Sequence, residues 1–178
     1  MIRYARLTTP LGTMIATAED GHLLGVDFED AKYAPSVDAS WREDREAQPL
    51  HACATQIADY FAGKRQHFDL PLAPRGTPFQ LRVWREIAKV PHGETISYAE
   101  LAARAGAPGS ARAAGAATGR NPLAIVVPCH RIVASNGALT GYAGGLARKR
   151  SLLAHEGTGT GDGSPEPSRR TVPEAALA

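Results

Sequence analysis

A proline- and glycine-rich segment, residues 71–76, separates two stretches of opposite charge, and this separation limits what the 178-residue chain can fold into. Residues 1–73 hold 7 Lys and Arg against 11 Asp and Glu, a balance of −4, whereas residues 74–156 hold 11 against 4, a balance of +7. Proline and glycine interrupt helices and strands, so the segment predicts a boundary. A chain of this length can form one ordinary domain or two small lobes. We expect two lobes, residues 1–73 and 77–157.

The composition excludes several classes of protein. Apolar residues make up 43% and charged residues 21% of the chain, close to the globular average and unlike a disordered chain. The two cysteines, Cys53 and Cys129, are too few for a disulfide scaffold, and the first six residues lack the apolar run of a secretory signal. Charged residues interrupt every apolar segment before the roughly 18 residues that a membrane helix needs. We therefore expect a cytoplasmic protein with no membrane partner.

The first lobe has the pattern of a small sheet with one helix. Short apolar runs at residues 11–16 and 22–28 flank an Asp-Gly step, which is typical of a β-hairpin. Residues 32–48 are polar and weakly patterned, and we expect a loop there. Apolar residues then recur at helical spacing from Leu50 to Phe61, with Cys53 among them as a core thiol. The first lobe is therefore expected to be an antiparallel sheet covered by a helix.

The second lobe is expected to be mostly helical. Thr77 followed by a proline predicts the start of a helix, and Ser97 with Glu100 predicts a capping box at the next one. Ser110 is the expected N-cap of a third helix. A final helix is predicted from Leu146 to His155, and residues 158–178, rich in Gly, Pro, Ser and Thr, are expected to be a disordered, dispensable tail.

The second and third of these helices form a candidate helix-turn-helix. They are joined by a short turn that contains glycine, and the third helix, residues 111–117, consists almost entirely of small residues plus Arg112. Small side chains let a helix approach a nucleic-acid groove closely, but they equally suit close packing in a core. Nine of the eleven cations of residues 74–156 are Arg, which fits a polyanionic partner or an ordinary solvated basic face. Both alternatives stay open at this point.

Cys129 is the candidate nucleophile. A continuous apolar run at residues 123–127 predicts a buried strand, and Cys129 and His130 follow directly after it. A thiol needs positive charge or a proton acceptor to become a thiolate, and His130 can supply the acceptor. Neighbours in an extended segment point to opposite faces, so we expect a relay through water. The alternative is that both are ordinary core residues. Neither a zinc site nor a phosphate-binding glycine motif is present, and we expect no metal.

One run decides between these alternatives. Residues 121–133 read NPLAIVVPCHRIV, and further characteristic segments lie at residues 79–84, 95–98, 111–113, 141–145 and 152–157. Together they resemble the O6-alkylguanine-DNA alkyltransferase family, and the resemblance covers roughly residues 77–157. It implies an α+β fold, with a ribonuclease H-like N-terminal α/β lobe and a mostly helical C-terminal lobe that contains a helix-turn-helix.

The resemblance also implies an activity. Such a protein repairs DNA by moving an alkyl group from O6 of guanine, or less readily from O4 of thymine, to its own cysteine, here Cys129. His130 would act through water as the base and Glu156 would orient it. Asn121 would brace the active-site turn, and Tyr98 would donate a proton or hydrogen bond to N3 of the departing guanine.

Base flipping is implied as well, because an alkyl group on O6 faces the interior of the duplex. Arg112 would fill the gap in the duplex, and the small residues after it would contact the minor groove. The loop at residues 141–145 would close over the base, with Tyr142 as an apolar wall. The full set implied for DNA is Arg112, Ala113, Gly115, Ala116 and Tyr98, and the set implied for the substrate is Tyr142, Ala143, Gly144 and Ile132.

The expected partner is double-stranded DNA that carries O6-alkylguanine or O4-alkylthymine, and no cofactor is expected. The protein is expected to be a monomer, and clustering along DNA stays open. Three rival functions were weighed. A non-catalytic lesion-binding protein would lack the acceptor cysteine. A cysteine hydrolase usually brings its histidine from far along the chain. A transcription regulator would need a sensor or dimerisation domain.

Overall fold

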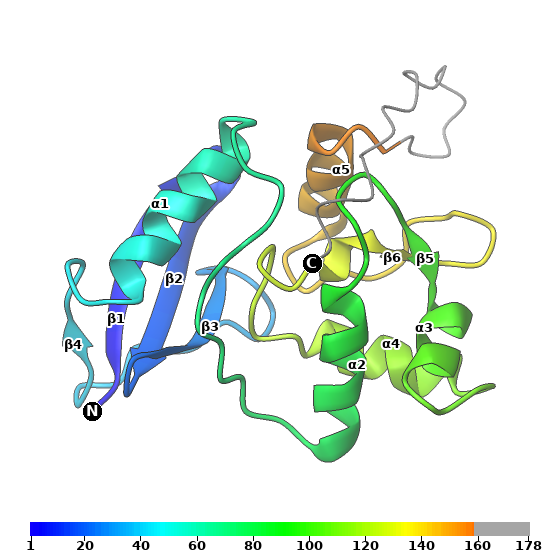
Figure 1. Cartoon of the computed structure of the whole chain (residues 1–178), viewed down its shortest axis with the longest axis horizontal. Coiled ribbons are helices and arrows are strands. Elements are labelled where there is room, and N and C mark those ends of the chain that lie inside the picture. Colours follow the sequence, from blue (N-terminus) through cyan, green and yellow to red (C-terminus); the bar gives the residue numbers. More distant parts are fainter. Residues whose placement is uncertain (159–178) are drawn as a thin grey trace.

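The N-terminal lobe is an antiparallel sheet with one helix on its face (Figure 1). In the computed structural model, which describes residues 1–158, the strands are β1 (Arg3–Thr9), β2 (Gly12–Glu19) and β3 (His22–Phe28). The short β4 (Arg42–Glu43) pairs in parallel with the start of β1. The order across the sheet is β3-β2-β1-β4, and α1 (Leu50–Phe61) packs on β1 and β2. The predicted antiparallel sheet and helix are confirmed in β1–β3 and α1, but the expectation of a loop throughout residues 32–48 was wrong, because β4 forms there.

Local residues explain these elements. Asp20 and Gly21 have φ angles of 49° and 78°, the left-handed region in which Asp and Gly are tolerated, and they reverse the chain between β2 and β3. The apolar face of α1, with Cys53, Ile57 and Tyr60 buried, lies on the sheet. Gly63 ends that helix with a φ of 74°. The expected hairpin and helix therefore form where the sequence pattern placed them.

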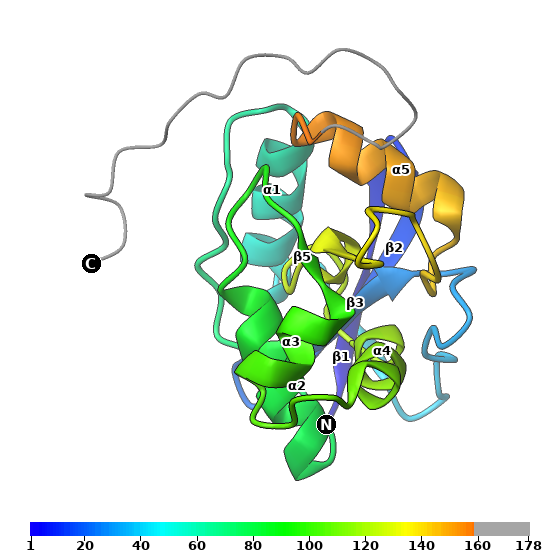
Figure 2. The same cartoon turned by 90° about the vertical axis from the view of Figure 1, so that its right-hand side faces the viewer.

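The C-terminal lobe contains four helices: α2 (Pro78–Ala88), α3 (Tyr98–Arg104), α4 (Ala111–Gly119) and α5 (Leu146–His155). Figure 2 shows α2, α3 and α4 grouped at one end of this lobe and α5 at the other. A two-residue parallel pair, β5 (Ile96–Ser97) and β6 (Ile132–Val133), lies between them. α3 and α4 contact each other and are joined by residues 105–110, which agrees with the candidate helix-turn-helix.

The three helix starts differ from one another. Thr77 and Gln80 form a complete capping box at α2. Ser97 accepts a hydrogen bond from the Glu100 backbone N–H at 3.1 Å, but the Glu100 carboxylate pairs with Arg104 at 2.6 Å instead of completing the box. Ser110 occupies the N-cap position of α4, as expected, but its side chain makes no capping hydrogen bond. An i,i+4 ion pair competes with the capping box at α3.

The two lobes share one edge of the sheet. Val26 of β3 donates its backbone N–H to Pro122 O and accepts from Ala124 N, both at 2.8 Å. The linker covers the same strand, because Leu23 donates to Pro71 O and accepts from Ala73 N, also at 2.8 Å. β3 is therefore paired with chain segments on both sides, and the buried core is continuous across the lobes.

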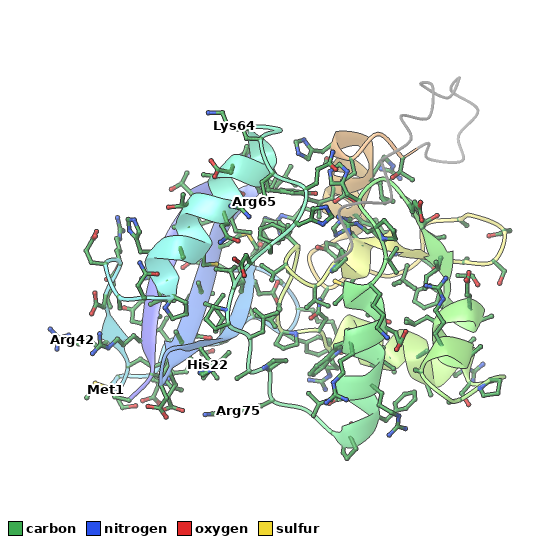
Figure 3. The ribbon with its side chains drawn as sticks, in the orientation of Figure 1. Met1, His22, Arg42, Lys64, Arg65 and Arg75 are labelled. Atoms are coloured by element: carbon green, nitrogen blue, oxygen red, sulfur yellow. The ribbon has the colours of Figure 1, made fainter. Side chains whose placement is uncertain are left out.

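Arg75, on the connection from the sheet to α2, forms an ion pair with Glu19 of β2 (Figure 3). The expected boundary at residues 71–76 thus lies on a connection held against the first lobe. The predicted tail, residues 158–178, lies outside the described residues apart from Thr158. Within residues 1–158, no helix combines the length and the apolar character needed to cross a bilayer.

Candidate active site

Cys129 opens a single turn of 3-10 helix, η1 (Cys129–Arg131). The Cys129 N–H donates to Val127 O at 2.8 Å, and the Arg131 N–H donates to Pro128 O at 3.0 Å. The expectation of an extended segment here was therefore wrong. Side chains at successive positions of a 3-10 helix diverge by about a third of a turn, so Cys129 and His130 leave the turn in different directions.

The apolar run before η1 is buried but does not form a regular strand. Only Leu123 makes a bridge to β3, and Ile125 has a φ of 69°, which breaks an extended backbone. Asn121 takes the place of strand pairing: its Nδ2 donates to Val127 O at 2.8 Å, and its Oδ1 accepts from Leu123 N at 3.0 Å. The side chain of Asn121 thus braces the turn that carries Cys129, the role expected of it.

His130 and Glu156 form a fully buried pair. His130 Nε2 lies 2.8 Å from Glu156 Oε2, and both side chains have 0% exposed surface. Burial is the largest influence on His130 and lowers its pKa, although the hydrogen bond to Glu156 acts in the opposite direction. A neutral imidazole facing a carboxylate carries its proton on Nε2, so Nδ1 has a free lone pair. Nδ1 is buried and has no hydrogen-bond partner among residues 1–158.

Two further side chains donate hydrogen bonds to Glu156. Arg131 donates to it through Nε at 2.7 Å and Nη2 at 2.9 Å, and the Tyr60 hydroxyl of α1 donates at 2.7 Å. Burial disfavours the ionised carboxylate, but the hydrogen bonds from His130 and Arg131 and the charge of Arg131 hold the pKa of Glu156 well below its usual range. Glu156 is therefore a buried anion that accepts four hydrogen bonds, three at Oε2 and one at Oε1. Sequence analysis missed both Arg131 and Tyr60 as partners.

Burial favours the protonated form of the Cys129 thiol. Burial raises the pKa of Cys129 to about 11; Asn121 and Lys149 lower it and the charge of Asp27 raises it. No hydrogen bond joins Cys129 to His130 among the described residues, which agrees with a relay rather than direct contact. The positive charge of the C-terminal lobe does not ionise the thiol, so a base has to remove the proton.

Lys149 of α5 holds the active-site loop, residues 141–145, in place. The sequence did not identify it as a site residue. Its side chain is fully buried, and Nζ donates to Ile132 O at 2.6 Å, Gly141 O at 3.2 Å and Thr140 O at 3.3 Å. Burial lowers the pKa of Lys149 to about 8. Through Lys149, these bonds connect the loop to the backbone carbonyl of Ile132 in β6. Ile132 was expected to contact the substrate, but here its carbonyl helps to hold the loop.

The loop at residues 141–145 is tied down from the N-terminal lobe as well. The Lys32 N–H donates to Ala143 O at 3.0 Å, and Arg148 Nη1 donates to Gly144 O at 3.1 Å. Arg148 also binds both carboxylate oxygens of Asp30, at 2.6 and 3.2 Å. The loop is therefore held by contacts from both lobes, with Tyr142 on it.

The small residues of α4 were expected either to pack in the core or to approach a nucleic-acid groove, and the two faces of the helix differ in this respect. Ala114 and Ala117 are buried, and the indole N–H of Trp84 donates to Ala117 O at 2.8 Å, so one face packs closely in the core. Arg112, Ala113 and Ala116 are exposed on the other face. The packing alternative thus holds for one side of the helix, and the exposed side leaves the groove-facing alternative open.

A cavity of about 770 Å³ lies between α4, the loop at 141–145 and β3. This volume is within the usual range for small-molecule sites. Tyr98 borders it and donates its hydroxyl to Thr140 O at 2.9 Å. The expected site residues on the cavity wall are Cys129, Asn121, Tyr98, Ala113, Gly115, Ala116, Tyr142, Ala143 and Gly144. Arg112, His130, Ile132 and Glu156 do not line it.

The cavity wall holds residues of both lobes, and the chain also matches known proteins along both lobes. Residues 78–158 match the family described as 6-O-methylguanine DNA methyltransferase, DNA binding domain, and residues 2–74 match its ribonuclease-like domain. The chain belongs to this family. The match spans both lobes, whereas the resemblance seen in the sequence was confined to roughly residues 77–157.

Individual relatives of this methyltransferase family agree. The methylated-DNA--protein-cysteine methyltransferase of Mycolicibacterium paratuberculosis is 46% identical over 156 residues, 88% of this chain and 93% of the relative. That of Methanosarcina acetivorans is 43% identical over 155 residues, 87% of this chain and 98% of the relative. The crystal structure of Mycobacterium tuberculosis OGT in complex with DNA superposes with a TM-score of 0.80 at 41% identity, covering 86% of this chain and 92% of that one.

No group of three or more His, Cys, Asp or Glu side chains within residues 1–158 is arranged to hold a metal ion. The thiol of Cys129 and the hydroxyl of Tyr98 border the cavity, and the next residue after the thiol is a histidine whose neutral imidazole donates to a carboxylate. This set suits a nucleophilic displacement in which the protein itself accepts a group.

Proposed function

We propose that this protein repairs duplex DNA by moving an alkyl group from O6 of guanine, and less readily from O4 of thymine, onto Sγ of Cys129. The observation that carries the proposal is that Cys129 borders a cavity of about 770 Å³ while His130 and Glu156 form a buried pair behind it. The cavity is large enough for a nucleobase, and its wall includes the helix-turn-helix that would contact DNA.

Proton removal from Cys129 is proposed to run through one water to His130 Nδ1. The Nδ1 atom suits this role because its lone pair is free while Nε2 donates to Glu156. The imidazolium that forms would lie against an ionised carboxylate, which stabilises it. A thiol whose pKa is about 11 therefore loses its proton only as the reaction starts.

The displacement itself balances simply. The Cys129 sulfur attacks the alkyl carbon, an S–C bond forms, and the C–O6 bond breaks with its electron pair left on the guanine. The Tyr98 hydroxyl would give a hydrogen bond or proton to N3, so that the guanine leaves as a neutral base. The thioether product has no route back to the thiol, so each molecule would react once.

The target base has to leave the duplex, because O6 faces the interior of the base stack. The exposed face of α4 offers Ala113 and Ala116 for close approach to the minor groove, and Arg112 would fill the space left by the base. Such binding relies on backbone and shape, which suits lesions in any sequence. We further propose that the protein acts as a monomer in the cytoplasm, with residues 1–73 and 77–157 as its two domains.

The deciding experiment is single-turnover transfer. Incubating the protein with a duplex that contains O6-methylguanine is expected to add one methyl group per molecule, at Cys129, without any added cofactor. Intact mass and peptide mapping measure the number and the place of the methyl groups. A lesion-binding protein would give no adduct, and a hydrolase would show repeated turnover, so either result would reject the proposal.

Arg112 can be tested separately. Arg112→Ala should slow repair of duplex O6-methylguanine by roughly tenfold or more, because holding a base out of the stack costs a few kcal/mol. Reaction with the free base O6-benzylguanine should be almost unchanged. Arg85→Ala, which removes an exposed cation from α2, is the matched control. Equal losses with both substrates would show that Arg112 does not act on the duplex.

A further inference from the structure

Asp27, near the end of β3, brings a carboxylate from the N-terminal lobe to the wall of the same cavity as Cys129. Its residue surface is only 7% exposed. Oδ1 accepts the Phe28 backbone N–H at 2.8 Å, and Asp27 forms no ion pair within residues 1–158. A buried carboxylate without a paired cation is unusual, and the proposed proton relay and displacement leave it without a role.

The charges that surround Asp27 come from four parts of the fold. Arg148 of α5 lowers its pKa, but the guanidinium of Arg148 is already engaged by Asp30, Leu11 O and Gly144 O. Asp30 raises the pKa of Asp27, and burial is the largest influence, so that the value reaches about 6. The charge of Asp27 in turn acts on Cys129 of η1 and on Tyr142 of the active-site loop.

The other polar group on this part of the wall is neutral. The Tyr142 hydroxyl is buried and has no hydrogen-bond partner among residues 1–158, and burial raises its pKa well above the usual value. Lys32 and Arg120 also line the cavity, but both are exposed and lie against the exposed Tyr33 ring. Lys149, whose charge also acts on Cys129, does not line the cavity, so among residues 1–158 Asp27 is the one acidic side chain on its wall, with Lys32 and Arg120 as exposed cations.

The position of an alkyl group follows from the proposed displacement. The group lies between O6 of the base and the Cys129 sulfur, so whatever extends from its reacting carbon is surrounded by the inner wall, to which Asp27 belongs. A neutral group meets no penalty there. A group that ends in a carboxylate would bring a second negative charge into a partly buried site that already holds one.

We propose that Asp27 makes the cavity select adducts by charge, so that neutral alkyl groups are transferred readily and groups that carry a carboxylate are transferred slowly. This inference rests on the proposed function of Cys129 as the acceptor. Two like charges a few ångströms apart in such a site slow the reaction of the charged group by on the order of tenfold.

The test uses two adducts of equal size, O6-carboxymethylguanine and O6-carbamoylmethylguanine, each in the same duplex. Their intrinsic reactivities differ, so the quantity compared is the ratio of the amide rate to the carboxylate rate. Asp27→Asn, which still offers an oxygen to the Phe28 N–H, should lower this ratio by roughly tenfold at pH 7.5. Glu29→Gln removes an exposed negative charge two positions further along the chain, one that pairs with Arg6 and does not line the cavity, and should leave the ratio as in the unmodified protein. An equal ratio in all three proteins would overturn the inference.

A second measurement needs no variant. In the unmodified protein the same ratio should fall as the pH drops through about 6, because protonation of Asp27 removes its charge. Protonation of Cys129 or His130 slows both adducts alike and cancels in the ratio. A ratio that stays constant between pH 5 and 8 would contradict the inference. Failure to transfer either adduct, or methyl, to Cys129 would instead reject the proposed function.

Discussion

Cys129→Ser will abolish alkyl transfer, with a loss of roughly 10⁴-fold or more, as is usual when an enzyme loses its nucleophile. A serine hydroxyl has a far higher pKa than a thiol, and its oxygen is a much poorer nucleophile toward a saturated carbon. The substitution changes only one atom of a side chain that is 7% exposed, so the fold and DNA binding should remain. The measurement is the amount of methyl group per protein after incubation with methylated duplex, together with the affinity for that duplex.

Cys53→Ser is the matched control for this prediction. Cys53 is also a buried thiol, and burial raises its pKa to about 12, but it lies in α1 and does not line the cavity. Cys53→Ser should keep full transfer even if burying its hydroxyl lowers stability somewhat. If Cys129→Ser still acquired a methyl group, or if Cys53→Ser lost it, Cys129 would not be the acceptor.

Much of the fold could be predicted because the signals are local. The Asp20-Gly21 step needs left-handed backbone angles that few other pairs accept, and it reverses the chain where expected. Thr77 with Pro78 starts α2 for an equally local reason, since the cap bonds lie within one turn. These features depend on neighbours in the chain and not on the rest of the molecule.

The segment before Cys129 could not be predicted from its pattern. Its apolar residues are buried as expected, but burial alone does not distinguish a strand from an irregular turn. Asn121 decides the matter by binding the backbone of Leu123 and Val127, and that bonding is visible only in three dimensions. The same holds for Ser110, which occupies the predicted N-cap position but, with φ of −101° and ψ of 42°, makes no side-chain capping bond.

The site was predicted where residues are neighbours in the chain and missed where they meet through the fold. Tyr60 and Asp27 come from the N-terminal lobe, far in sequence from Glu156 and Cys129. Lys149 did leave a signal in the sequence: it lies three and four residues before Leu152 and Leu153, on the buried side of α5. A lysine on an apolar helix face indicates a buried partner, here the carbonyl groups of the active-site loop.

Glu156→Gln should have the second largest effect, because it removes the charge on which three other groups depend. It would leave the guanidinium of Arg131, which is 5% exposed, without its counter-ion, a loss that typically costs about 3–5 kcal/mol of unfolding free energy. It would also remove the anion that stabilises protonated His130, so transfer should slow by on the order of 10²- to 10⁴-fold. Urea unfolding at pH 7.5 and the rate with O6-benzylguanine measure the two effects, with the exposed Glu100→Gln as control.

The pH dependence of stability separates this charge from simple packing. The pKa of Glu156 is lowered in the folded protein, so its stabilising contribution is fully present above its ordinary value of 4.5 and is lost as the pH falls toward the lowered pKa. The stability difference between the unmodified protein and Glu156→Gln should therefore be largest near neutral pH and should shrink on acidification below about 4.5. A difference that persists unchanged at pH 3 would mean that the charge of Glu156 does not cause it, and its proposed role in charging His130 would fail with that result.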